Sequence, residues 1–360
     1  MQLKNFLAAA ICTADTRLRR GVLLLLSIIV LPLCVVSCDW LDSRDPIFEY
    51  PHDGDVDPTL VTVNLTCHCC SEIPLYQVVT LTKGNLTSGY RRYTYAILSE
   101  EGEVVKEGHL ERDVDDYSDI RLSFSLPSGE YRAVMWQDFT DNAGVPFYDA
   151  SSLNAVLIRD AASYVGCTDL KDASWNITNL SIPESKEWYQ TIDYEANLER
   201  PLAKITFIST DGPIFMQRCA EYLKTKSGIN NDNEQVKNRI DLVFSYEGYI
   251  LTRFNATLGE FRNSSLGYSF AGELKETDKP TDLLIGTDYV FVNGEEGVYT
   301  LKLRVIDNLD GRVIEETKNI RVPVRRGHET IVTGDILTMY WGQGVSIDPE
   351  FSGEFDVIIK

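Results

Sequence analysis

The run Cys67-His68-Cys69-Cys70 brings together residue types that bind soft metal ions. Zinc ligands are usually spaced by two or more residues, and adjacent residues of an extended segment point to opposite faces. The sequence holds no second Cys/His pair that would complete a ligand set. We therefore expect neither a metal site nor a cofactor. A disulfide with Cys167 or Cys219, or simple burial, is the better interpretation of the cluster.

Carboxylates are abundant, and two arrangements of them suggest chemistry. Acidic pairs such as Glu315/Glu316 would have to converge across a cleft to act as a glycosidase does, and in so acidic a chain they more often form a solvated face. Asp53, Asp55 and Asp57 alternate as in a calcium loop, but the glutamate that completes an EF-hand is missing and Asn64 lies near its register. A linker is the simpler interpretation of this acidic run.

Motifs of nucleophilic, metal-hydrolytic and nucleotide chemistry are absent from the sequence. It has no Gly-x-Ser-x-Gly elbow, no His-Glu-x-x-His, no phosphate-binding Gly-rich loop ending in Lys-Ser/Thr and no dinucleotide fingerprint. Histidine is scarce, with 4 residues, which lowers the odds of His-based catalysis. The sequence therefore favours a binding or structural protein over an enzyme, with no catalytic residues.

Cys38 lies in a context that predicts acylation. A basic leader precedes the apolar stretch Gly21–Cys34, which has the length of a signal-peptide core and is short for a membrane span. The run Val35-Val36-Ser37-Cys38 then resembles the bacterial lipobox, in which the cysteine is acylated and becomes the mature N-terminus. Cys34 is a poorer candidate because bulky Leu33 precedes it. We expect a lipid-anchored protein on the outer surface of the cell outer membrane.

The remaining cysteines do not form an evident disulfide framework. Five follow Cys38, an odd number that cannot all pair within one chain. These five residues are Cys67, Cys69, Cys70, Cys167 and Cys219. The sequence does not determine which of them pair.

Composition limits the class of partner. The 360 residues include 54 acidic and 34 basic side chains, for a formal net charge of −20. Phosphate recognition depends on Lys and Arg patches, so nucleic acid is not an expected partner. A hydrophobic share of 44% is that of a folded chain, and the length suggests about two domains.

Alternating apolar and polar residues predict β-strands along most of the mature chain. Such alternation marks strands with one face on a core and one in water. Clear examples are 61–66, 120–126, 299–305 and the apolar run 202–208. The turn Pro127-Ser128-Gly129 predicts a hairpin into 131–136. The most convincing helix is expected between Asp211, as a cap, and Gly228, with Pro213 in its first turn.

The order of several segments resembles the fimbrillin-A-associated anchor proteins, which are fimbrium-anchoring lipoproteins of Bacteroidetes. The resemblance covers most of the mature chain and is strongest after Glu199. The segments that carry it are the lipobox at Cys38, Leu126–Tyr131, Glu199–Ile205, Gly248–Tyr249, Phe254–Ala256, Val322–His328, Ile331, Gly334–Thr338 and Ile347–Phe351.

This resemblance implies an all-β fold of two transthyretin-like β-sandwich domains in tandem, with one or two short helices and no enzymatic activity. The expected organisation is 1–37 signal peptide, 38–58 tether, 59–198 N-terminal sandwich and 199–360 C-terminal sandwich. It also implies that the chain attaches a fimbria to the outer membrane and terminates it there. Its partners would be fimbrial stalk subunits, joined through strand donation.

Three segments bear on that mechanism. Thr59–Thr66 is the candidate for a first strand that an anchor keeps and a stalk subunit loses to an arginine-specific protease. Cleavage after Arg44 would instead make a stalk or tip subunit, although Asp45-Pro46 is an unpromising site. The C-terminal segment 355–360 could be a donor strand or the last strand of its own sheet, and we prefer the second.

A stand-alone adhesin that binds a glycan or a host protein is the competing hypothesis. It would use a patch of loops in the region 137–186, with Trp136, Tyr148 and Trp175 as candidate contacts. The sequence identifies neither a receptor nor the fimbrial subunits that would be joined.

Overall fold

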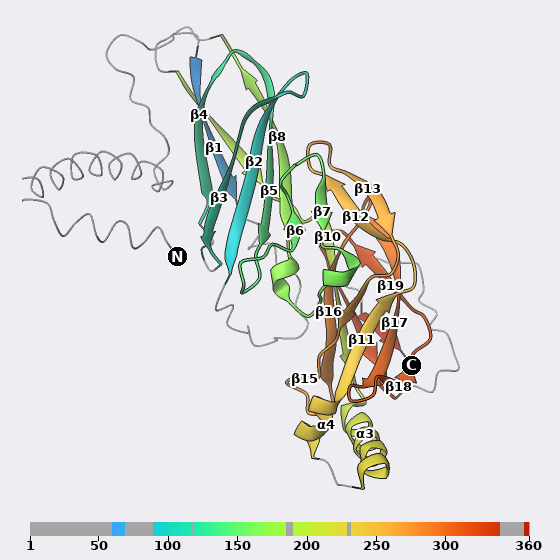
Figure 1. The fold of residues 1–360 in the computed structure, drawn as a ribbon. Coiled ribbons are helices and arrows are strands. Elements are labelled where there is room, and N and C mark those ends of the chain that lie inside the picture. The colour runs from blue at the N-terminus through green and yellow to red at the C-terminus, as the bar shows by residue number, and fades with distance from the viewer. Residues whose placement is uncertain are drawn as a thin grey trace, which may run out of the picture. The chain divides into compact units, whose positions relative to one another are not determined.

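The computed structural model describes residues 60–68, 89–114, 116, 118–184, 190–228, 232–338 and 356–359. The chain divides into two compact units, Met1–Asp57 and Pro58–Lys360, and all described residues belong to the second. Figure 1 shows that this unit is built mainly of strands. The all-β fold class with short helices is therefore confirmed. No helix among the described residues is long and apolar enough to cross a membrane.

Two packed sheets form the first β-sandwich. Its strands in the described chain are β1 (Leu60–His68), β2 (Tyr90–Ser99), β3 (Val104–Asp113), β4 (Ile120–Pro127), β5 (Gly129–Phe139), β8 (Ser174–Ile182) and β9 (Thr191–Asn197). One sheet has the order β4-β1-β9 and the other β3-β2-β5-β8. Alternate side chains of β1 and β4 point inward and meet those of β2, β5 and β8 in one core, as the period-2 pattern predicts.

The second β-sandwich has larger sheets. Its strands are β10 (Leu202–Ser209), β11 (Ile240–Tyr246), β14 (Ser269–Ala271), β15 (Lys275–Glu276), β16 (Leu283–Phe291), β17 (Glu296–Asp307), β18 (Arg312–Glu316), β19 (Ile320–Arg325), β20 (Glu329–Gly334) and β21 (Asp356–Ile359). One sheet has the order β15-β16-β10-β20-β21; in the other, β14-β11-β17-β18 are joined by β19 on β17. The two sheets share a large apolar core.

A third core covers the outer face of the four-stranded sheet. A short sheet of order β13-β12-β7-β6 contributes to it, with β6 (Tyr148–Asp149), β7 (Val156–Ile158), β12 (Ile250–Asn255) and β13 (Glu260–Ser265). Every residue from Ala133 to Asp138 of β5 is consequently buried, because this strand has packing on both faces. The domain boundary near Glu199 stays a prediction; β7 and β12, which come from either side of it, pair with each other.

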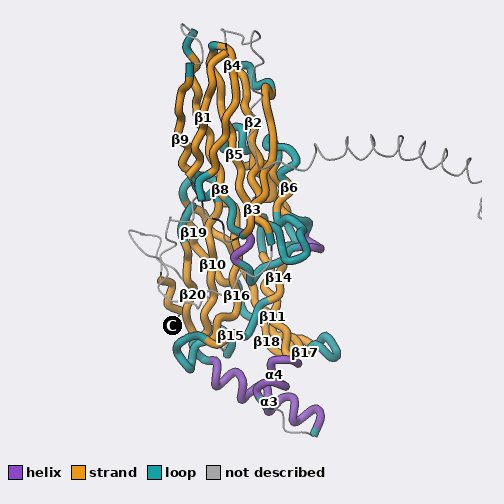
Figure 2. The backbone as a smooth tube through the Cα atoms, turned by 90° about the vertical axis from the view of Figure 1, so that its left-hand side faces the viewer, coloured by secondary structure: helices purple, strands orange, loops and turns teal. Residues whose placement is uncertain are grey.

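Two helices, α3 (Gly212–Ser227) and α4 (Asn233–Arg239), lie at one end of the second sandwich (Figure 2). The expected helix is confirmed as α3, with Asp211 at the N-cap and Gly228 in the left-handed conformation at its end. Asp211 does not cap through its side chain. Its carboxylate accepts bonds from the Ser209 hydroxyl and the Thr338 backbone N–H, so it ties the helix start to the strand ends instead.

The hairpin expected at Pro127-Ser128-Gly129 is wrong. The chain does turn there, with Gly129 at a positive φ of 153°, but β4 pairs with β1 while β5 pairs with β2 and β8. The turn therefore carries the chain from one sheet to the other. Alternation in both flanking strands identified the strands but not their partners, because pairing depends on residues distant in sequence.

Candidate functional site

The first strand, β1, lies in the centre of the three-stranded sheet. It pairs antiparallel with β4, from Leu60 opposite Pro127 to Cys67 opposite Ile120, and parallel with β9, from Thr62 opposite Thr191 to His68 opposite Asn197. The strands β4 and β9 do not pair with each other. The backbone of β1 therefore holds this sheet together on both sides.

Burial along β1 follows a strict alternation. The inward side chains Val61, Val63, Leu65 and Cys67 are between 0% and 2% exposed. On the outer face, the Asn64 amide donates to Asp193 of β9 at 2.9 Å and accepts from the Ser123 hydroxyl of β4 at 2.9 Å. Because a slip by one residue would turn the apolar set outward, these contacts fix the register of β1.

The interaction of β1 with its two neighbours is strand pairing and involves no catalytic group. Pairing of this kind uses backbone groups, while the inward positions accept apolar side chains. In this sheet the central position is taken by the chain's own β1. The strand predicted at Thr59–Thr66 is thus found at Leu60–His68, bonded on both edges.

The structure separates the members of the metal-like cluster that it describes. Cys67 points into the core, while His68 points outward and its Nδ1 lies 3.2 Å from the carboxylate of Asp119. Cys69 and Cys70 lie outside the described residues. Within the described ranges no group of three or more His, Cys, Asp or Glu side chains is placed to hold a metal ion.

A disulfide to Cys167 or Cys219 was one of two interpretations of the cluster; Cys67 forms neither, and Cys67, Cys167 and Cys219 are all thiols. Cys67 is in the core of the first sandwich and Cys219 in that of the second, so simple burial is the interpretation that holds for both. Burial raises the pKa of the Cys219 thiol to about 12, and likewise that of Cys167. Neither thiol is therefore primed as a nucleophile.

The aromatic binding face expected for an adhesin does not exist as predicted. Trp136 is 0% exposed and Tyr148 is 1% exposed, and their rings pack edge to face with centroids 5.5 Å apart. Trp175 packs edge-on against Phe254, and its indole N–H donates to the Ala256 carbonyl at 2.9 Å. These rings belong to the packing of the third core, as aromatic residues in sandwiches commonly do.

The C-terminal strand β21 pairs in parallel with β20, from Asp356 opposite Ile331 to Ile359 opposite Gly334. It is one of the two end strands, with β15 as the other, of the sheet β15-β16-β10-β20-β21. The preference for a strand of the chain's own sheet is confirmed. Cys38, Arg44 and the whole leader lie outside the described residues, so acylation and cleavage stay predictions.

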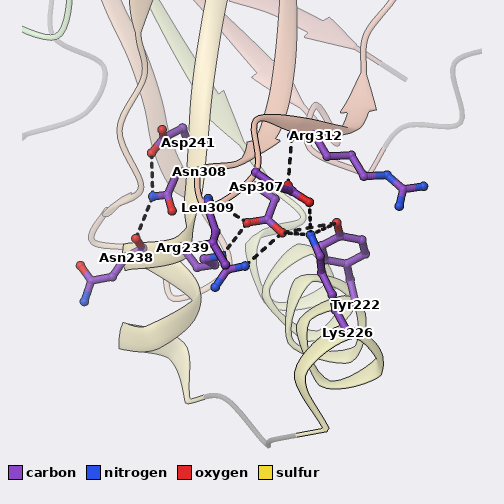
Figure 3. Close-up of polar contacts among 10 residues, drawn as sticks. Tyr222, Lys226, Asn238, Arg239, Asp241, Asp307, Asn308, Leu309 and Arg312 are labelled. Carbon is purple, nitrogen blue, oxygen red and sulfur yellow. Dashed lines mark hydrogen bonds and ion pairs between the residues drawn. The ribbon is translucent and has the colours of Figure 1, made fainter.

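One buried carboxylate fixes the helical end of the second sandwich. Asp307, at the end of β17, is 0% exposed and accepts bonds from Arg239 of α4 and from Lys226 of α3, the latter at 2.7 Å (Figure 3). The hydrogen bonds from Arg239, followed by those from Lys226, hold the pKa of Asp307 well below its ordinary value of 3.8. Both helices are thus fastened to the β17–β18 hairpin through one side chain.

We expect Asp307→Asn to lower the thermal unfolding midpoint by several degrees near neutral pH. The folded-state pKa of Asp307 is depressed, so its ionised form stabilises the fold above pH 3.8 and this contribution is lost as the pH falls through the folded-state pKa. The difference in midpoint between wild type and variant should therefore shrink as the pH is lowered beyond 3.8. Calorimetry across this range checks it, and a difference that stays constant into acid would contradict the assignment.

A family model, described as "Family of unknown function (DUF6562)", matches residues 56–360. The chain belongs to this family. The matched range includes every described strand of this DUF6562 protein, from β1 to β21. No curated relative matches the sequence.

Several solved structures are similar to this DUF6562 chain. The fimbrial anchor protein Mfa2 of Porphyromonas gingivalis is 13% identical with a TM-score of 0.35, covering 72% of this chain and 81% of its own. The tip fimbrial protein Mfa3 of the same organism, with a C-terminal truncation, is 9% identical with a TM-score of 0.37 and the same two coverages. A candidate adhesin of Bacteroides thetaiotaomicron is 11% identical with a TM-score of 0.40, covering 78% of this chain and 94% of its own.

Proposed function

We propose that this DUF6562 protein is a lipid-anchored fimbrial subunit that attaches a surface fimbria to the outer membrane and ends it there. The acyl group is carried by Cys38, and the neighbouring fimbrial subunit is joined by β-strand complementation. The proposal gives the chain a mechanical role, with no catalytic residue and no cofactor.

The central position of β1 is the observation that carries this proposal. A subunit whose first strand has been removed would offer the gap between β4 and β9 to an incoming strand. Here β1 fills that gap, with four inward side chains buried and pairing on both edges. A chain that keeps this strand fills its own acceptor groove and cannot accept a strand from another subunit there. This is the property expected of the subunit at the end of a fimbria.

Contact with a neighbour must then use a strand edge elsewhere. Among the described strands, β21 is one of the two end strands of its sheet, so its outer edge is a candidate for this pairing. The tether 38–58 would leave the sandwiches exposed to solvent while acyl chains hold the N-terminus. With a net charge of −20, acyl chains rather than a basic patch must hold the chain on an anionic membrane.

The test is Cys38→Ala in the native organism, followed by membrane fractionation and electron microscopy of fimbria length. We expect wild type to fractionate with the outer membrane, and the variant to leave it and to shed or lengthen its fimbriae. Cys34→Ala is the matched control, because Cys34 is the poorer acylation candidate and its loss should change neither readout. Unchanged fimbriae around a protein that has left the membrane would contradict the anchoring role.

A further inference from the structure

An open cleft of about 690 Å³ lies on the outer face of the first sandwich. Its floor is the exposed end of the four-stranded sheet, where β2 and the edge strand β3 run side by side. Its opposite wall is the segment 148–154, which covers the neighbouring strand β5 as part of the third core. The cleft lies where this cover ends, and its volume is typical of small-ligand sites.

Strand alternation decides which side chains line the cleft. Cross-strand partners in a sheet share a face, and the register sets Thr94 opposite His109, Arg92 opposite Glu111 and Ala96 opposite Glu107. The β3 members of these pairs, Glu107, His109 and Glu111, are all exposed. The side chains of Glu107, His109 and Glu111 therefore form a row of hydrogen-bonding groups along one side of the cleft.

The two arginines that line the cleft already form hydrogen bonds and ion pairs within the protein. Arg92 binds the buried Asp138 through two bonds of 2.9 and 2.7 Å and also donates to the Tyr148 carbonyl. Arg159 binds Asp141 and the carbonyls of Pro146 and Val145. Neither guanidinium is available to neutralise a bound anion.

The other polar groups are short and suited to hydroxyl groups. Ser151, Ser152 and Asn154 line the wall, and in the described part of the chain no side-chain hydrogen bond or ion pair engages Thr94 or His109. Aliphatic side chains interrupt this polar lining: Val104 is exposed and Ile158 is half-buried, while Leu98 and Leu153 lie buried beneath the surface. Such a mixture matches a sugar, which has hydroxyl groups around its rim and apolar C–H faces.

The two glutamates of β3 are too far apart to act together in hydrolysis. Glu107 and Glu111 are four residues apart on one strand, which places them about 13 Å from each other. The paired carboxyls of glycosidases lie about 5–9.5 Å apart. These two glutamates can accept hydrogen bonds from hydroxyl groups, but they do not form a hydrolytic pair.

We propose that this cleft binds a short neutral oligosaccharide. Anionic sugars are disfavoured because the lining has unneutralised carboxylates and no uncommitted arginine, in a chain of net charge −20. The site is independent of lipidation and of strand donation, so it gives the protein a second, ligand-binding role beyond the proposed function.

The test is calorimetric titration of the purified protein with maltotriose, mannotriose and triacetylchitotriose, next to trigalacturonate and trilysine as charged probes. We expect at least one neutral trisaccharide to bind. His109→Ala and Glu107→Gln should each weaken that binding by about tenfold, the first by removing a hydrogen bond and the second by replacing a charged acceptor with a weaker neutral one. Both positions are exposed, so their thermal unfolding midpoints should match wild type.

Glu296→Gln is the matched control, since this exposed glutamate lies on β17 outside the cleft and should leave binding unchanged. Three results would overturn the proposal: no binding of any neutral trisaccharide, binding that His109→Ala and Glu107→Gln leave intact, or equal binding of trigalacturonate. Preferential binding of trilysine would also overturn it, because the cleft would then be a surface for cationic peptides.

Discussion

Replacing Trp136 by alanine is expected to lower the free energy of unfolding by about 3–5 kcal/mol. Trp136 is fully buried at the centre of the third core. Its ring packs against Tyr148 at 5.5 Å and Phe254 at 5.8 Å, and its indole N–H donates to Asp138 at 3.1 Å. The substitution removes this packing and leaves a cavity between strands distant in sequence.

Urea unfolding followed by far-ultraviolet circular dichroism measures the effect. Tyr249→Ala is the control, because Tyr249 is 67% exposed and its truncation should cost less than about 0.5 kcal/mol. If the two variants lost similar stability, Trp136 would not be the packing centre that the structure describes. The experiment also tests the corrected role of Trp136, which the sequence offered as a glycan contact.

Local pattern predicted those elements whose environment is simple. In β1 and β17, one face meets a core and the other meets solvent, so alternation in the sequence reproduces alternation in burial. The strand β10 was recognised from its apolar run, yet all eight of its residues are buried, Lys204 and Thr206 included. The sequence could not indicate that Lys204 would be buried with Asp169 and Glu329 as ion-pair partners.

Long-range pairing accounts for what the sequence did not predict. The turn at Gly129 was assigned to a hairpin because both neighbours alternate, but only the tertiary structure places β4 and β5 in different sheets. Helix α4 was missed although Asp232 and Gln235 form a capping box at its start. With seven residues, it is too short for a helical pattern to stand out.

The two candidate sites differ in how far the sequence could reach them. The strand β1 was predictable, because a strand needs only its own alternation to be recognised. The cleft was not, since Thr94, His109 and the wall 148–154 meet only through the register of β2 with β3 and the packing over β5. The competing adhesin hypothesis placed a binding face in the region 137–186. Its segment 148–154 does form one wall of the cleft, and of the three aromatic contacts named for that face only Tyr148 is among the residues that line it.

A buried ion pair in the second sandwich should give the other large effect. The Asp288 carboxylate on β16 binds Lys171 and accepts hydrogen bonds from the Tyr164 and Tyr246 hydroxyls, each at 2.7 Å. The Lys171 and Asp288 side chains are 5% and 1% exposed, and the Lys171 ammonium lies 3.8 Å from the centre of the Tyr164 ring. Burial lowers the pKa of Lys171, so its charge depends on this carboxylate.

We expect Asp288→Asn to cost about 3–5 kcal/mol, because it leaves the Lys171 ammonium buried without a counter-charge. Lys171→Met should cost a comparable amount by leaving the carboxylate uncompensated. The double variant should be less destabilised than the sum of the two, by roughly 2 kcal/mol, since it removes both charges together. Urea unfolding of the four proteins in the cycle measures this coupling.

The exposed pair Arg262–Glu260 provides the comparison, with side chains 53% and 57% exposed. The same cycle there should give a coupling within about 0.5 kcal/mol, because solvent screens exposed pairs. Additive effects at Lys171 and Asp288 would mean that water reaches this pair and that its charges act independently. A strong coupling between Lys171 and Asp288 would show that their ion pair is shielded from water. It would also show that this pair holds the segment before β8 against β16, so that replacing either partner alone is costly.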